Sequence, residues 1–146
     1  MQYDPSVWGP HYWFFLHTVA HSYPENPNEV TKRKYYDLIQ NMPLFIPIAE
    51  MGNKFSNMLD NYPVTPYLDN KASFIRWVHF IHNKFNHLLG KEEVSLQMGL
   101  DKYINEYKPK PIYLSDKINL RKHYIHIAVI LICVFLIYVF YKDMNI

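Results

Sequence analysis

The pattern of apolar and polar positions is clearest between Trp77 and Lys91, where the chain reads WVHFIHNKFNHLLGK. Apolar residues occur all round this stretch, whereas its polar side chains recur at i, i+3, i+4 and i+7 and so share one helical face. These side chains are His79, His82, Asn83 and Asn86. The pattern predicts a buried helix with one polar seam. Gly90 ends this helix, and Lys91 follows at its C-terminal end, where the helix dipole favours a cation.

The polar seam needs partners, because unpaired buried polar groups each cost kcal/mol of stability. Three kinds of partner are open: other side chains of the core, a metal ion, or a ligand rich in hydrogen-bonding groups whose phosphates would meet Lys91. A metal is the least favoured, because no acidic or cysteine ligand lies near His79 and His82 at a metal-binding spacing. The sequence therefore predicts no metal site.

The same periodicity, taken together with the capping residues and prolines that flank each segment, predicts four more helices. They span residues 10–22, 28–41, 48–61 and 92–107. Pro10 is placed at the start of the first helix, where its missing N–H costs nothing. In that helix Trp13, His17 and Ala20 lie on one face, at i, i+4 and i+7. The prediction is an all-α bundle of four helices with a short fifth.

The C-terminal part differs from the rest, because the run from Tyr124 to Tyr141 carries no formal charge. Its length suits the about 17–25 residues that a membrane-spanning helix needs, and tyrosines lie near its ends. A buried core helix is the alternative, but a small five-helix domain has little room for a helix that is apolar all round.

We therefore expect a helical domain at residues 1–107, a proline-containing linker at 108–122 and a transmembrane anchor at 123–142. More Lys and Arg precede the span than follow it, so the positive-inside rule predicts that the N-terminal domain is cytoplasmic.

Composition narrows the possible functions. The chain has 146 residues and a net charge of only +2, which suits one modest domain and argues against a nucleic-acid partner. Cys133 is the single cysteine, so no intramolecular disulfide can form and nothing indicates an oxidising compartment. Residues 1–10 are polar and contain two prolines, so no signal peptide is expected.

Two separated motifs carry a family resemblance. WGPHYWFFLHTVAHSYP, residues 8–24, and the later HN-x-x-N-x-x-L-x-K resemble the Erv/ALR family of FAD-linked sulfhydryl oxidases, and most of all the short single-domain forms of large DNA viruses. The resemblance covers residues 6–107. The matching positions are Trp8, Gly9, Trp13, Leu16, His17, Ala20, Pro24, Trp77, His82, Asn83, Asn86, Leu89 and Lys91.

The resemblance implies an Erv/ALR-like bundle with FAD as cofactor, and a homodimer formed through the first two helices. Tryptophan would stack on the flavin, His and Asn would hydrogen-bond it, and Lys91 would lie near the pyrophosphate. The cofactor-binding residues that it implies are Trp8, Gly9, Trp13, His17, His79, His82, Asn83, Asn86 and Lys91.

One departure from the family pattern affects the chemistry. Where the family has P-C-x-x-C, this chain has P-I-x-x-M, so Ile48 and Met51 occupy the positions of the redox pair and no catalytic residue is predicted. An isoleucine and a thioether cannot form a disulfide or a thiolate. The family's second cysteine pair, a clamp, is also absent, since its positions correspond to His79 and Leu96.

Three functional hypotheses follow. The first is a membrane-anchored, FAD-binding pseudo-enzyme that serves as a scaffold in thiol oxidation, on a cellular or viral membrane and with a viral or thiol-redox protein as partner. The second is an active sulfhydryl oxidase that uses a dithiol lent by a partner chain. The third is a structural membrane protein without a cofactor.

Overall fold

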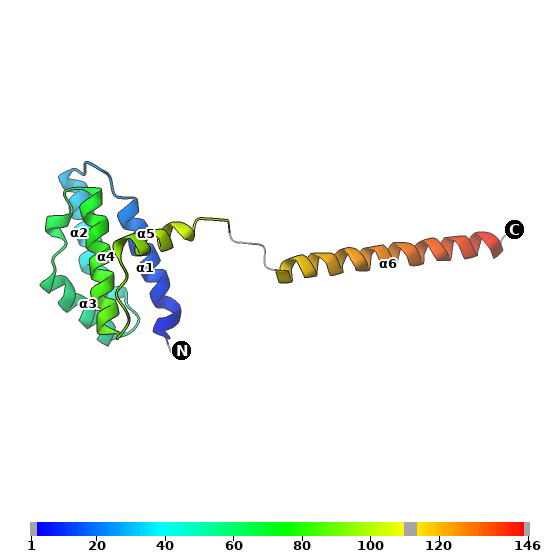
Figure 1. Cartoon of the computed structure of the whole chain (residues 1–146), viewed down its shortest axis with the longest axis horizontal. Helices are drawn as coiled ribbons and strands as arrows, with labels where there is room; N and C mark the ends of the chain where they lie inside the picture. The colour runs from blue at the N-terminus through cyan, green and yellow to red at the C-terminus, as the bar shows by residue number, and fades with distance from the viewer. Residues whose placement is uncertain (1–2, 110–113, 145–146) are drawn as a thin grey trace. The chain divides into compact units, whose positions relative to one another are not determined.

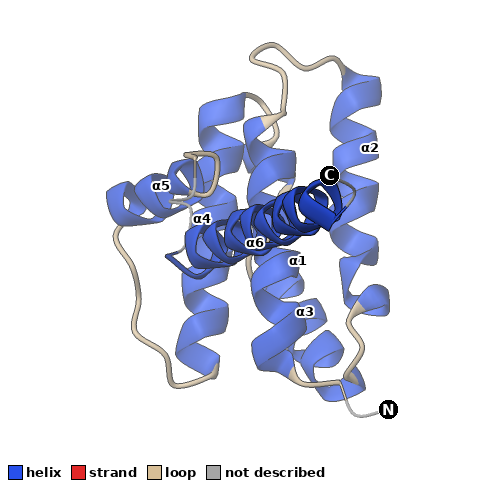
Figure 2. Cartoon of the chain, turned by 90° about the vertical axis from the view of Figure 1, so that its right-hand side faces the viewer, coloured by secondary structure: helices blue, strands red, loops and turns tan. Residues whose placement is uncertain are grey.

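The computed structural model describes residues 3–109 and 114–144, and the elements of these ranges are helical throughout. Contacts divide the chain into two compact units, Met1–Tyr107 and Lys108–Ile146. The elements are α1 (Pro5–His21), α2 (Glu29–Asn41), η1 (Met42–Phe45), α3 (Ala49–Asn61), η2 (Thr65–Tyr67), α4 (Lys71–Leu88), α5 (Leu96–Asn105) and α6 (Leu114–Met144). The predicted all-α fold is confirmed. Helices α1–α4 form the bundle of the first unit, and α2 and α5 lie on opposite sides of the pair formed by α1 and α4 (Figures 1 and 2).

The first helix begins earlier than predicted. Asp4 is its N-cap and accepts a hydrogen bond of 2.8 Å from the Ser6 N–H, while Pro5 takes the first helical position. The expectation that Pro10 starts the helix was wrong, because the Asp-Pro pair is an earlier start signal and Pro10 is tolerated inside the helix.

The fifth helix is shorter than the predicted 92–107. Ser95 caps it by accepting a hydrogen bond of 3.2 Å from the Met98 N–H, so the helix begins at Leu96 and ends at Asn105. The residues between Gly90 and Ser95 are an extended connection without regular secondary structure.

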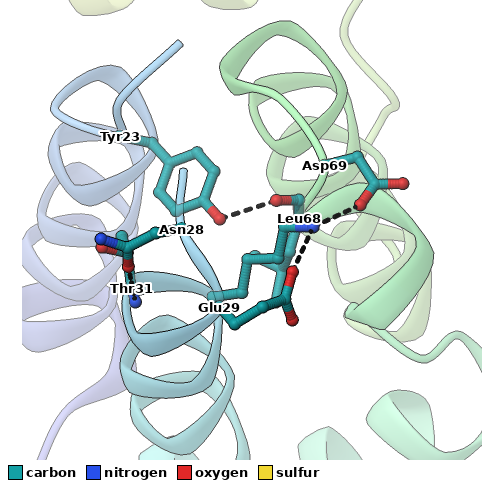
Figure 3. Close-up of polar contacts among 7 residues, drawn as sticks. Tyr23, Asn28, Glu29, Thr31, Leu68 and Asp69 are labelled. Carbon is teal, nitrogen blue, oxygen red and sulfur yellow. Dashed lines mark hydrogen bonds and ion pairs between the residues drawn. The ribbon is translucent and has the colours of Figure 1, made fainter. Parts of the chain in front are cut away.

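The core of the first unit is apolar and strongly aromatic. Its members include Leu16, Ala20, Ile39, Phe55, Leu59, Phe74, Trp77, Ile81 and Phe85. Tyr23 is also fully buried, and its hydroxyl donates a 2.7 Å hydrogen bond to the Leu68 carbonyl (Figure 3). Because that polar atom is satisfied, the ring can occupy the core at little cost.

Beside Tyr23, Lys32 of α2 bridges Glu29 and Asp69 at 3.0 and 2.9 Å (Figure 3). Both carboxylates are largely exposed, so this bridge adds little to stability compared with the buried contacts beneath it. It does mark where the turn before α4 meets the start of α2.

The N-terminus of α3 is fixed by close packing on η1. A Cβ at Gly52 would lie 2.7 Å from the Pro43 carbonyl oxygen, so only glycine permits this approach. Ile48 is the N-cap residue and Met51 lies in the first turn, with both side chains half-buried.

The second unit contains α6, which begins at Leu114 and therefore includes part of the stretch expected to be linker. Within Ile118–Lys142 the most apolar 18-residue window has a mean hydropathy of 2.5, and none of that window is buried within the protein. By length and composition it can cross a membrane, and its exposed apolar surface is unlike that of a core helix.

Candidate functional site

A layer of aromatic and imidazole rings lies between α1 and α4, the two helices that pack most closely in the bundle. Trp13 of α1 stacks on His82 of α4, with ring centroids 4.1 Å apart and planes within 7°. His17, one turn after Trp13, places its Nε2 3.1 Å from Nδ1 of His82. The sequence predicted all three as site residues, and the structure brings them together.

Burial keeps both imidazoles neutral. It lowers the pKa of His17 to about 4 and that of His82 to about 3. Nearby cationic groups lower both pKa values further. They are His79 and His21 for His17, and His17, His79, Lys102 and Lys91 for His82. One neutral ring therefore donates its N–H to the lone pair of the other.

This pair predicts a loss of stability in mild acid. The unfolded chain has ordinary histidine pKa values near 6.5, so between pH 6.5 and 4 it binds more protons than the folded chain, and the free energy of unfolding falls as pH falls. At about 1.4 kcal/mol per pKa unit, we expect a loss of roughly 2–4 kcal/mol between pH 7 and 5.

Chemical denaturation of the full chain in detergent, followed by tryptophan fluorescence, measures that slope. Replacing exposed His11 or His87 by Gln should leave the slope unchanged, whereas replacing His17 and His82 together by Gln should flatten it. An unchanged slope in the double variant would mean that other groups carry the acid sensitivity.

The start of α3 lies on one side of this ring layer. Phe55 of α3 makes edge contacts with Trp13 and Phe85, at centroid distances of 6.1 and 5.9 Å. Met51 precedes Phe55 by one helical turn on the same face and packs against the core. Met51, in the first turn of α3, thus lies one helical turn from a residue that contacts the ring layer.

A short helix, α5, forms the other side. Tyr103 stacks on His21 of α1 with ring centroids 4.4 Å apart, and its hydroxyl donates to Thr18 Oγ1 at 3.3 Å. The Tyr107 hydroxyl lies 2.9 Å from that of Tyr103. His21, Tyr103 and Phe55 were missed by the sequence analysis: His21 continues the i+4 spacing of His17, but Tyr103 lies on a short helix with no motif to mark it.

The remaining predicted residues take different places. His79 and Asn83 bind the backbone of Val94. The Asn86 carbonyl accepts a 2.9 Å hydrogen bond from the Lys91 N–H, and Gly90 between them has φ +67°, which glycine adopts without strain. Lys91 itself is exposed.

Near the start of α1, Trp8 packs edge-on against Tyr12 at a centroid distance of 5.2 Å, next to half-buried Gly9. Among the described residues, Trp8 Nε1 and His21 Nε2 are the buried side-chain polar atoms without a hydrogen-bond partner. Both lie on α1, and such atoms are rare unless a ligand or water satisfies them. Stacking rings, neutral imidazoles and an unpaired indole N–H suit a flat heteroaromatic ligand with carbonyl groups.

Comparison with known proteins identifies the family of the chain. The model of the Erv1/Alr family matches residues 10–108. The chain belongs to the Erv1/Alr family. The recognition of this family from the two sequence motifs is thereby confirmed.

Two relatives show the range of the Erv1/Alr family. A mimivirus protein from Acanthamoeba polyphaga mimivirus, named a probable FAD-linked sulfhydryl oxidase, is 29% identical over 108 residues, which are 73% of this chain and 76% of the relative. The FAD-linked sulfhydryl oxidase ERV1 of Arabidopsis thaliana is 32% identical over 79 residues, which cover 54% of this chain and only 40% of the relative.

Solved structures show the same fold. The crystal structure of the yeast Erv1 core matches with a TM-score of 0.62 at 22% identity, and the match covers 74% of this chain and 86% of the yeast chain. The FAD-binding domain of Erv1 from Saccharomyces cerevisiae has a TM-score of 0.65 at 21% identity, over 73% of this chain and all of its own.

Proposed function

We propose that this chain binds FAD against the α1–α4 ring layer and acts as a membrane-anchored pseudo-enzyme or scaffold of a thiol-oxidation pathway. The observation that carries the proposal is the Trp13–His82–His17 arrangement in a member of the Erv1/Alr family. Relatives are named FAD-linked sulfhydryl oxidases, and one structural neighbour is an FAD-binding domain.

The flavin would be held by residues of both helices. Trp13 and Trp8 offer aromatic faces for stacking, while His17 and His82 offer imidazole N–H groups and lone pairs. Asn86 and the ammonium group of Lys91 follow on α4 and just beyond it, where a cation suits the pyrophosphate. The half-buried Gly9, beside Trp8, leaves the backbone open to close approach, since nothing lies within 4 Å of where its Cβ would be. Bound FAD would supply a two-electron acceptor at this site.

Electron delivery from a protein thiol is the missing part. A disulfide at the start of α3 would be attacked by a substrate thiolate, forming a mixed disulfide and releasing the second sulfur as a thiolate, but Ile48 and Met51 have no thiol, and Cys133 is the only cysteine in the chain. Neutral His17 and His82 can hold and orient a ring but cannot replace a sulfur nucleophile. The chain therefore keeps the residues for the cofactor and lacks those for disulfide exchange.

Two assays on the full chain in detergent test this proposal. We expect FAD to copurify or to bind when added, and oxygen consumption with a reduced protein substrate to stay at the level of free FAD. Rapid oxidation of protein thiols by the isolated chain would refute the pseudo-enzyme. Oxidation that appears only with a dithiol-bearing partner would favour the active-oxidase alternative.

We also propose that α6 anchors the protein in a cellular or viral membrane with the helical domain on the cytoplasmic side. The apolar run is exposed, and Arg121 and Lys122 precede it, in keeping with the positive-inside rule. A chain ending at Tyr107 should therefore be soluble and folded, whereas the full chain should stay in the membrane pellet after carbonate washing. Extraction of the full chain by carbonate would contradict the anchor.

A homodimer through α1 and α2 is proposed as well. Both helices carry exposed large apolar side chains that a partner surface would cover: Val7, Phe15, Val30 and Tyr36. The oligomeric state of the soluble part is measurable by sedimentation.

A further inference from the structure

We propose that His79 and Asn83 are positioning residues: together with Val94 they form a clamp that fixes α5, and through Tyr103 this helix closes one side of the α1–α4 ring layer. The contacts of the clamp stand on their own. The statement that the closed side belongs to a flavin site rests on the proposed function.

The clamp is a set of directional hydrogen bonds to one residue. Asn83 Nδ2 donates to the Val94 carbonyl at 2.7 Å, and the Val94 N–H donates back to Asn83 Oδ1 at 3.1 Å. His79 Nε2 lies 2.9 Å from the same carbonyl, which can only accept, so Nε2 carries the proton. Asn83 Nδ2 also lies 3.2 Å from His79 Nε2, so both groups of the Asn83 carboxamide face partners within the chain.

Val94 is the residue where this restraint has most effect. It lies in the extended connection after Gly90 and directly precedes Ser95, the N-cap of α5. This connection has no regular secondary structure, and the three hydrogen bonds to Val94 tie the start of α5 to α4. The ion pair of Lys84 with Glu93, at 3.8 Å, is a weaker link beside them. Through its side chain, Asn83 on the rigid helix α4 thus holds the backbone of Val94, which lies 11 residues later in the sequence.

His79 also touches α5 directly. A Cβ on Gly99 would lie 2.8 Å from both Cε1 and Nδ1 of the imidazole, so α5 packs against the ring as closely as glycine allows. Tyr103 follows Gly99 by one turn on the same face. The clamp and this contact therefore set where Tyr103 meets His21 and Thr18 of α1.

The predicted consequence is that loss of the clamp frees α5 while the core of α1 and α4 stays folded. In Asn83→Asp, a carboxylate faces the Val94 carbonyl and cannot donate to it. Asn57→Asp, on the exposed face of α3, is the matched control for the same change of charge. We expect amide hydrogen exchange in residues 94–105 of the full chain in detergent to rise by at least about tenfold in Asn83→Asp, with unchanged exchange in α4 and in the control.

Two more variants guard against misfolding and test the mechanism. Gly99→Ala should loosen the same segment, because the new methyl group would collide with His79. His79→Gln, which keeps a donor for the Val94 carbonyl, should retain more protection than His79→Leu. Unchanged exchange in residues 94–105 of both Asn83→Asp and Gly99→Ala would overturn the clamp.

FAD titration of the same proteins separates this inference from the proposed function. If the unmodified chain binds no FAD, the proposed function fails, and the exchange data still decide the clamp. If it binds, Asn83→Asp and Gly99→Ala should each weaken affinity about tenfold, in step with exchange of α5. Weakened affinity in Asn83→Asp with unchanged exchange would make Asn83 a direct cofactor contact and contradict its positioning role.

Discussion

Replacing Ile48 and Met51 together by cysteine is expected to create thiol-dependent oxygen consumption that the unmodified chain lacks. Ile48 is the N-cap of α3 and Met51 lies in its first turn, so the two thiols would be one turn apart at the positive end of the helix dipole. Such a position lowers a thiol pKa, and the i, i+3 spacing suits a disulfide. A substrate dithiol would then be oxidised to a disulfide while two electrons pass through the new pair and FAD to oxygen.

The gain should reach roughly tenfold or more over the unmodified chain with the same reduced protein substrate, measured with an oxygen electrode. The single variants Ile48→Cys and Met51→Cys are the matched controls, since neither can form the internal disulfide, and both should stay at background. If the unmodified chain already oxidises protein thiols at a rate that the double variant does not raise, a different electron path exists and the pseudo-enzyme proposal is wrong.

A second large effect is expected from His82→Ala. The change removes the ring stacked on Trp13 and the partner of His17, and it leaves a buried imidazole nitrogen of His17 unpaired. We expect FAD affinity to fall by roughly 10- to 100-fold, equivalent to about 1.4–2.7 kcal/mol.

His87→Ala is the matched control for that experiment, because His87 lies on the same helix but is exposed. Equilibrium titration of each protein with FAD, alongside a thermal melt, separates lost binding from lost folding. Equal FAD affinity in the two variants at equal folded fractions would show that His82 does not contact the cofactor.

Much of the fold and part of the site were predictable from sequence. The i, i+3, i+4 and i+7 spacing correctly placed His79, His82, Asn83 and Asn86 on one helix, and the Trp13–His17 spacing placed the facing residues on another. The Erv/ALR motifs then indicated that these two faces meet. Pairing of His17 with His82 across 65 residues follows from the tertiary packing, which periodicity alone does not contain.

Other features depend on contacts that sequence patterns do not encode. The start of α1 was misplaced because Pro10 looked like a start signal, while the Asp4–Pro5 cap precedes it. The family resemblance implies cofactor contacts for Asn83 and His79, which stay a prediction. The hydrogen bonds of their side chains to the Val94 backbone could not be predicted from the motif. The family resemblance places a cysteine clamp at the positions of His79 and Leu96, and this chain has no cysteine there. In the structure, hydrogen bonds to Val94 and the close packing of Gly99 on His79 tie α4 to α5.

The most direct test is the visible absorption spectrum of the purified full chain, before and after addition of FAD and removal of the unbound cofactor. The proposed function predicts a protein-bound flavin band in stoichiometric amount. A protein that melts cooperatively as a helical fold, yet stays colourless after incubation with excess FAD, would contradict FAD binding and favour a structural membrane protein without a cofactor.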